Sequence, residues 1–328
     1  MNIDFLKEVL SIPSISGDES MVRDYIIEYA KENGIEYYTD AKKNLYLTKG
    51  SSKMTSGEYY PCVVSHMDTV HSSHRELIES KTNLIIEDSE MGTLIAKHPT
   101  TKEQTGIGGD DKCGVYVCLE MFERFDVLKG AFFVEEEIGM LGSKQADDKF
   151  FENVGYAIQF DAPSSNWISE VCSGVKLFDE DFKKEIKGTL NECGYTKFSV
   201  DPFTDVNQLA SKYDFNCLNL GCGYYRQHST SEYVVVEEVS DSIKAGYELI
   251  TKLGMEKYIH KKIEKKTLVN ETNYSYLSYN DSEDYDFESD EYDELAESIS
   301  DLVIDMYING VSEEEIKEEL ANHLRGMY

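Results

Sequence analysis

Residues 105–114 read T-G-I-G-G-D-D-K-C-G, in which three glycines run into two adjacent carboxylates, Asp110 and Asp111. A helix-like apolar run over residues 115–122 follows at once. Glycines permit a tight turn and a close approach of the backbone, whereas two carboxylates at the mouth of a buried helix carry a desolvation cost that a cation or hydrogen-bond donors must offset. A helix N-cap, where Asp is favoured, accounts for only one of them.

Four other places in the chain put an acid or a histidine just after a short apolar run that is typical of a buried parallel strand. The runs are residues 62–64, 132–134, 157–160 and 218–220, and the groups that follow them are His66 and Asp68, Glu135 to Glu137, Asp161, and His228. Ligands of open α/β sheets bind beyond the carboxyl ends of the strands, so these groups are expected to converge. Two histidines and several carboxylates that converge predict a metal site.

Six motifs give the chain a resemblance to a known family. They are S-H-M-D-T-V (65–70), G-G-D-D-K-C-G (108–114), E-E-E-I-G-M-L-G-S (135–143), F-D-A-P (160–163), T-D-V-N-Q-L-A (204–210) and R-Q-H-S-T-S-E (226–232). Each motif is weak alone, but all six occur in the family's order, and with I-P-S-I-S-G-D-E (12–19) they cover about the first 260 residues. The chain resembles the M20/M28/M42 clan of dinuclear zinc peptidases, and most of all the peptidase T branch of M20.

The resemblance implies an α/β fold in which helices flank a mainly parallel, mixed sheet, and the alternation of strands and helices predicts the same class. It also implies two divalent metal ions at the carboxyl edge of the sheet. Asp110 would bridge them, His66 and Asp161 would complete one, and Glu137 and His228 the other. Mixed histidine and carboxylate shells suit zinc, with cobalt or manganese as substitutes.

Two further carboxylates are implied to serve catalysis. Asp68 lies two residues after His66, so in an extended chain its carboxylate can orient the imidazole. Glu136 is the implied general base, which takes a proton from a metal-activated water and passes it to the leaving amine. Glu135 and Glu137 would share one face of an extended strand, so a one-residue slip is physically conceivable, but the glycine at 139 anchors the alignment with Glu136 as base.

Residues beside these motifs have plainer interpretations. Asp111 and Lys112 are expected to serve the turn and the helix start, and Cys113 to be a small packed thiol. Tyr225 and Arg226, just before the last histidine, are candidates for binding a substrate terminus, with structural roles as an equal alternative.

A hairpin is predicted between the first two motifs, with residues 84–86 against residues 93–96. This region holds three histidines that follow no strand and have polar neighbours in sequence. We predict that they are surface residues rather than metal ligands: His71, His74 and His98.

Composition limits the partners and the compartment. The 328 residues carry a net charge of -31, which argues against nucleic acid and anionic membranes as partners. Seven cysteines without a C-x-x-C pair indicate reduced thiols and a cytoplasmic protein. No apolar run is long enough for a membrane span, and the first ten residues do not resemble a secretion signal.

The spacing of the motifs predicts the domain organisation. M20 enzymes usually insert a lid or dimerisation domain between the last carboxylate ligand and the final histidine, but Asp161 and His228 are too close in sequence to leave room for one. We predict a catalytic domain over residues 1–262, an acidic, tyrosine-rich linker over 263–292 and a helical hairpin over 293–328. The hairpin would pack on the main domain, a second copy or a protein partner. In the catalytic domain a helix is expected from Ser240, with these residues inward: Ile243, Tyr247, Ile250 and Leu253.

Three functions follow from these patterns. The first is an aminopeptidase that acts on short peptides. The second is a carboxypeptidase, dipeptidase or N-acyl-amino-acid deacylase with the same metals. The third, of another class, is an interaction scaffold that acts through the acidic C-terminal tail.

Overall fold

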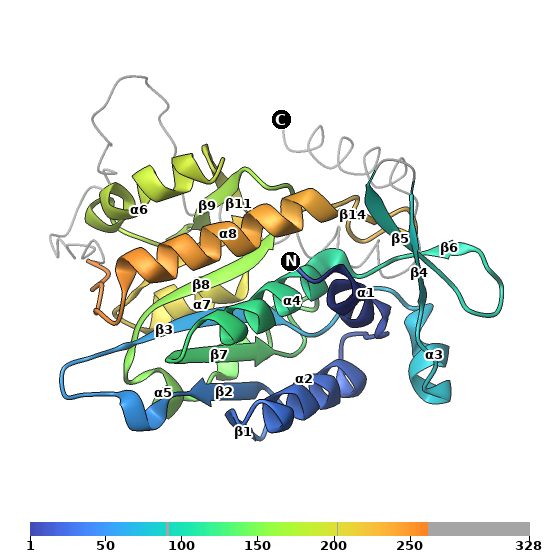
Figure 1. Ribbon diagram of the computed structural model, residues 1–328, viewed down its shortest axis with the longest axis horizontal. Helices are drawn as coiled ribbons and strands as arrows, with labels where there is room; N and C mark the ends of the chain where they lie inside the picture. Colours follow the sequence, from blue (N-terminus) through green and yellow to red (C-terminus); the bar gives the residue numbers. More distant parts are fainter. Residues whose placement is uncertain (90–91, 202, 262–328) are drawn as a thin grey trace, which may run out of the picture. The chain divides into compact units, whose positions relative to one another are not determined.

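The four apolar runs form the middle of one large sheet. A computed structural model (Figure 1) describes residues 1–89, 92–201 and 203–261. Its central strands are β7 (Leu128–Phe133), β3 (Tyr60–His66), β8 (Val154–Ala162) and β12 (Asn216–Gly221), which are parallel neighbours in that order. Every residue of β3, β7 and β12 is buried, as expected for parallel strands with both faces covered. The predicted mainly parallel, mixed sheet is confirmed.

Antiparallel strands complete the two sides of this sheet. On one side β2 (Leu45–Lys49) pairs with β7, and β1 (Glu36–Thr39) pairs with β2. On the other side β9 (Trp167–Cys172) runs antiparallel to β12 and also pairs with β10 (Val175–Lys176) and β11 (Lys197–Asp201). The described residues thus give a nine-stranded sheet.

A smaller sheet contains the predicted hairpin. β4 (Ile85–Asp88) pairs with β5 (Thr93–Lys97), and β6 (Gln104–Thr105) pairs with the other side of β5. β5 also pairs with β14 (Tyr233–Val235), which in turn pairs with β13 (Tyr224–Tyr225). The segment around His228 is therefore attached to the hairpin that precedes Asp110 in the chain.

Helices cover the large sheet. α4 (Gly109–Arg124) lies on β3 and β8 and is flanked by α1 (Ile3–Ser11) and α8 (Val236–Leu253), while α7 (Asp205–Lys212) packs on the opposite face (Figure 1). The remaining helices are α2 (Ser20–Glu32), α3 (His74–Ser80), α5 (Asp148–Phe151) and α6 (Glu180–Glu192). Two predictions for α8 were wrong, because the helix begins at Val236 rather than Ser240 and Tyr247 is 41% exposed.

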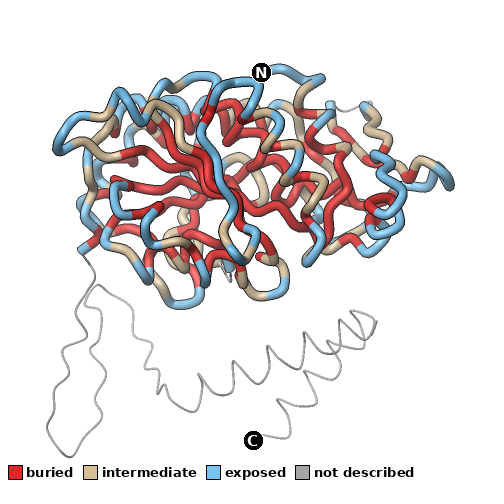
Figure 2. Tube along the Cα trace, turned by 90° about the horizontal axis from the view of Figure 1, so that it is seen from below, coloured by how far each residue is buried: buried red, intermediate tan, exposed pale blue. Residues whose placement is uncertain are grey.

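Buried residues concentrate along the central strands and exposed residues along the outer loops (Figure 2). None of the helices in the described ranges combines the length and the apolar character that a membrane crossing requires. The predicted linker over residues 263–292 and the predicted helical hairpin over 293–328 lie outside the described residues.

Candidate metal centre

The first turn of α4 places Asp110 at the carboxyl edge of the sheet. Gly108, which precedes the helix, has a left-handed φ of 64°. A Cβ there would lie 2.8 Å from side-chain atoms of Thr69 and Lys112, so both its conformation and its surroundings favour glycine. Asp110 and Asp111 themselves have non-helical backbone angles, and regular helix begins after them. The glycine-rich stretch therefore holds Asp110 on a turn at the end of α4, next to the ends of β3 and β7.

The carboxylate of Asp110 lies between the two predicted histidine ligands. Its Oδ1 is 3.1 Å from Nε2 of His66, and its Oδ2 is 3.3 Å from Nε2 of His228. His66 ends β3, whereas His228 comes from the loop between β13 and β14. One carboxylate with an imidazole at each oxygen is the arrangement that a bridging ligand requires.

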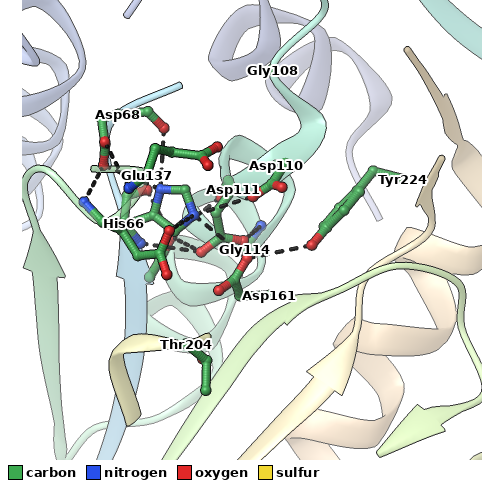
Figure 3. A network of polar contacts seen from close by, with 12 residues as sticks. His66, Asp68, Gly108, Asp110, Asp111, Gly114, Glu137, Asp161, Thr204 and Tyr224 are labelled. Carbon is green, nitrogen blue, oxygen red and sulfur yellow. Dashed lines mark hydrogen bonds and ion pairs between the residues drawn. The ribbon is translucent and has the colours of Figure 1, made fainter. Parts of the chain in front are cut away.

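The other two carboxylates divide between the same histidines. Oδ1 of Asp161, on β8, is 3.5 Å from Nε2 of His66 (Figure 3). Oε2 of Glu137 is 3.0 Å from Nε2 of His228. All five residues predicted as metal ligands are thus brought together: His66, Asp110, Glu137, Asp161 and His228. The shortest histidine–carboxylate distances pair Asp161 with His66 and Glu137 with His228, while ligand atoms of Asp110 and Glu137, and of Asp111 and Asp161, also lie within 4.8 Å of His66.

Asp68 is fully buried behind this cluster. Nδ1 of His66 lies 3.1 Å from the backbone carbonyl oxygen of Asp68 and 3.3 Å from its Oδ1, and Oδ1 accepts a hydrogen bond from the backbone N–H of Glu136 at 2.9 Å. Its Oδ2 accepts one from the backbone N–H of Glu137 at 3.2 Å and one from the hydroxyl of Ser16 at 2.7 Å. Asp68 therefore fixes a histidine and the backbone of two glutamates at once.

The three consecutive glutamates point in different directions. β7 ends at Phe133, and Glu135 has a left-handed φ of 53°, so the alternation of an extended strand does not apply here. The side chain of Glu135 forms an ion pair with Lys42. Oε2 of Glu136 lies 3.9 Å from Nε2 of His66, while Glu137 faces His228. The arrangement matches the register with Glu136 and Glu137 at the centre, and a slip that would bring in Glu135 does not occur.

The electrostatics of the cluster show an excess of negative charge. Burial, and then the Asp110 carboxylate, raise the pKa of Glu137 to about 7, and burial together with Asp110 and Asp205 raises the pKa of Asp161 to about 7. Burial lowers the pKa of His228, but Asp110 and Glu137 outweigh it and raise the pKa to about 11. The raised pKa values reflect carboxylates crowded together in a buried place.

The donor set fits divalent metal ions. Two donors held at zinc distances by one tetrahedral ion lie about 3.3 to 3.6 Å apart, and the histidine–carboxylate separations here are 3.0 to 3.5 Å. Oε1 of Glu137 is buried without a hydrogen-bond partner. Asp111 also lies near His66, but its carboxylate is used by the Ser65 hydroxyl and by the backbone N–H groups of His66 and Gly114. It serves the turn, as expected.

Three residues at the centre had no role assigned from the sequence. The hydroxyl of the buried Tyr224 lies 3.4 Å from Oδ1 of Asp161. Asp205, at the start of α7, is fully buried, its Oδ1 has no hydrogen-bond partner, and burial raises its pKa to about 7. Glu232 is fully buried beside the Asp110 turn. Asp205 and Glu232 both belong to recognised motifs, which was the available signal.

The three histidines predicted at the surface are all buried, so that prediction was wrong: His71, His74 and His98. Each of the three contacts a polar group from another part of the chain. His71 contacts Glu232, His98 contacts Glu76, and His74 lies between Ser14 and the carbonyl of Gly106. None belongs to the two groups of potential metal ligands in the described residues.

His74 is buried between two backbone segments. Its Nδ1 lies 3.0 Å from the carbonyl oxygen and 3.3 Å from the backbone N–H of Ser14, and its Nε2 lies 3.0 Å from the carbonyl oxygen of Gly106. Burial, and then the neighbouring Lys112 and His71 side chains, lower the pKa of His74 well below its usual value.

The two substrate-binding candidates lie beside the centre. The hydroxyl of Tyr225 donates to the carboxylate of Glu238 at 2.7 to 2.8 Å, and its ring stacks on Tyr233. Arg226 is exposed at a left-handed φ of 54°. The contacts of Tyr225 are those of a structural residue. Cys113 is a buried thiol, and Lys112 is fully buried with its ammonium on the carbonyl oxygens of Leu10 and Ile12.

Solved structures share this arrangement of strands and helices. The aminopeptidase PepT from Bacillus cereus superposes with a TM-score of 0.60 at 15% identity, over 76% of this chain and 97% of that one. The present chain thus has the fold of solved aminopeptidases. A tripeptidase from Staphylococcus aureus gives a TM-score of 0.57 at 14% identity, over 76% of this chain and 96% of that one. An aminopeptidase from the archaeon Desulfurococcus kamchatkensis gives a TM-score of 0.59 at 14% identity, over 77% of this chain and 95% of that one.

No protein-family model matches the chain, and no curated protein matches it significantly. At these identities the structural likeness establishes the fold, and the activity has to be argued from the site.

Proposed function

We propose that this protein is a metal-dependent hydrolase that cleaves peptide bonds, specifically an aminopeptidase that acts on short peptides. The observation that carries the proposal is the position of Asp110, whose two oxygens face His66 and His228 at 3.1 and 3.3 Å. A shared carboxylate can hold two metal ions about 3.5 to 4 Å apart, which is the spacing in two-metal hydrolases. The aminopeptidase fold supports the same assignment.

Two divalent cations, zinc first with cobalt or manganese as substitutes, fit this donor set. Asp110 would be shared, His66 and Asp161 would complete one site, and Glu137 and His228 the other. When bound, such a pair lowers the pKa of a water molecule and polarises the carbonyl of the scissile bond.

Glu136 is the general base in this proposal. Its carboxylate lies beside His66, and Asp68 holds its backbone through the N–H group at 2.9 Å. From this position the carboxylate can take a proton from the attacking water and give it to the leaving amine. Asp68 orients the imidazole of His66 in the same arrangement.

The charge of the centre favours the amino end of a peptide. A free amino terminus is cationic, whereas a free carboxyl terminus is anionic. Glu136 and Asp205 are buried carboxylates outside the proposed ligand set, and their charge would attract the first and repel the second. This argument places an aminopeptidase ahead of a carboxypeptidase.

The test compares one unblocked tripeptide with its N-acetylated twin, each incubated with the zinc-loaded protein with and without chelator. Cleavage of only the free peptide, abolished by the chelator, is expected. Cleavage of the acetylated twin would replace the aminopeptidase by a deacylase or carboxypeptidase. Cleavage of neither peptide would favour the alternative function, an interaction scaffold that acts through the acidic C-terminal tail.

A second test counts metal ions. His228→Ala is expected to lose one of two metal equivalents, because it removes the only nitrogen donor from the set that contains Glu137. The ions are counted by elemental analysis after gel filtration, beside the wild-type protein. Unchanged metal content would remove His228 from the ligands.

We also propose that this catalytic domain lacks an inserted lid. The residues between Asp161 and His228 contribute β9 to β13, α6 and α7, and all the strands among them pair within the two sheets. This part of the chain is therefore used in the core, which supports the proposal.

A further inference from the structure

Glu232 has a contact set that goes beyond filling a core position. Its Oε2 accepts the backbone N–H of Gly108 at 2.7 Å and lies 2.7 Å from Nε2 of His71. Its Oε1 accepts the backbone N–H of Asp110 at 3.1 Å. The side chain is fully buried, so both of its oxygens are used inside the protein.

These contacts join segments that are far apart in the chain. Glu232 closes the loop that carries His228, and its own N–H donates to the carbonyl oxygen of Ser229 at 3.2 Å. In that loop His228 has a left-handed φ of 60°, a conformation that needs support from its surroundings. Through the carboxylate, the His228 loop is tied to the turn that presents Asp110.

The glycines of that turn make room for the Glu232 contacts. A Cβ on Gly106 would lie 2.0 Å from the ring of His71, and a Cβ on Gly109 would lie 3.3 Å from Oε1 of Glu232. Any larger residue at 106 would displace the imidazole that holds the carboxylate. The glycine run of residues 106–109 and the Glu232–His71 pair therefore form one arrangement.

We propose that Glu232 is a positioning residue that sets the spacing between Asp110 and His228, and so the affinity of the cation held between them. The inference rests on the proposed function, because it assumes that these two side chains bind a common ion. Both oxygens of Glu232 are engaged by His71, Gly108 and Asp110, so Glu232 is not proposed as a ligand. It acts on the backbone N–H of Asp110 and on the loop of His228.

The experiment is a Co²⁺ titration of the full-length, metal-free protein, followed by visible absorption. In Glu232→Gln the amide has one oxygen in place of two, so the N–H of Gly108 or of Asp110 must face an NH₂ group. We expect about 10-fold weaker binding of one Co²⁺ in this variant and about 100-fold in Glu232→Ala, the range found for residues that orient metal ligands. The other Co²⁺ should bind with an affinity closer to that of the wild type.

Glu120→Gln is the matched control. Like Glu232, Glu120 is a buried carboxylate, but it lies on α4, far along the helix from Asp110. It accepts a hydrogen bond from the hydroxyl of Tyr116 and forms an ion pair with Arg124. Its loss should leave Co²⁺ affinity unchanged. Wild-type Co²⁺ affinity in a folded Glu232→Gln protein, or an equal loss in Glu120→Gln, would overturn the proposal.

Two further outcomes are separable. If Glu232→Gln does not fold, His71→Gln replaces it, since this change removes one partner of the carboxylate. Weaker Co²⁺ binding by His71→Gln would support the proposal, and wild-type Co²⁺ affinity would overturn it. A wild-type protein that binds no Co²⁺ would refute the proposed function itself, whereas two tightly bound Co²⁺ ions in every variant would refute only the role of Glu232.

Discussion

Asp68→Asn tests how much of the centre depends on one carboxylate. In the wild type the two oxygens of Asp68 serve the backbone N–H groups of Glu136 and Glu137, the Ser16 hydroxyl and the imidazole of His66. Asparagine has the same shape but only one oxygen. Its NH₂ group must therefore face one of the two backbone N–H groups, which leaves that donor buried and unpaired.

The structure sets the size of the effect. An unpaired buried donor costs about 1 to 3 kcal/mol, and for a domain of this size each kcal/mol lowers the melting temperature by about 2 to 4 °C. Misplacement of a histidine ligand costs about 10- to 100-fold in metal affinity or activity. We expect Asp68→Asn to melt several degrees below the wild type and to lose kcat/KM for a tripeptide by about 10- to 100-fold at saturating zinc.

Asp179→Asn is the control for the stability term alone. The carboxylate of Asp179 also accepts backbone N–H groups on both oxygens, from Phe182 at 2.9 Å and Lys261 at 2.9 Å, but it caps α6 away from the centre. It should lower the melting temperature with kcat/KM unchanged. An Asp68→Asn enzyme with wild-type kcat/KM would refute the positioning role, and wild-type melting would refute the argument from the buried donor.

Three further predictions use other parts of the molecule. Glu136→Gln should keep both metal equivalents and lose nearly all turnover, and an active variant would remove Glu136 as base. Gly142→Ala should destabilise the protein by about 3 kcal/mol or more in urea unfolding, because the added Cβ would lie 2.3 Å from a backbone carbonyl oxygen. Gly188→Ala in α6 is the control: its Cβ would have no atom within 4 Å, so this change should stabilise the protein by up to about 1 kcal/mol. The pKa of His74 is lowered in the folded state, so its contribution to stability is present above pH 6.5 and is lost below that pH. Between pH 6 and 5 the unfolding free energy of the wild type should therefore fall more steeply than that of His74→Gln, by about 1.4 kcal/mol per pH unit. Equal slopes for the two proteins would contradict this prediction.

The central strands were predictable because strands buried on both faces are short, nearly continuous apolar runs. The apolar runs at 62–64, 132–134, 157–160 and 218–220 are β3, β7, β8 and β12, and the polar groups after them meet as expected from parallel pairing. The sorting of carboxylates between His66 and His228 came from the resemblance rather than from any periodicity, and it stays a prediction.

The failures concern burial by distant segments. His71 is buried because Glu232, 161 positions later, closes over it, and nothing near His71 in the chain indicates this. Glu135 leaves the centre because of a single left-handed residue after β7, which a strand alternation does not describe. Tyr247 fits the apolar stripe of α8 by spacing, yet it is partly exposed beside Phe125.

The order of the ligands along the chain has a consequence for synthesis. His66, Asp110, Glu137 and Asp161 emerge from the ribosome well before His228, whose loop is held between β13 and β14, and β14 must pair with β5 from the first third of the protein. Until that late segment docks, the second ligand set has no imidazole and the Asp110 turn lacks Glu232. A nascent or truncated chain would thus carry an incomplete centre, so the proposed activity would be absent until His228 and Glu232 are in place.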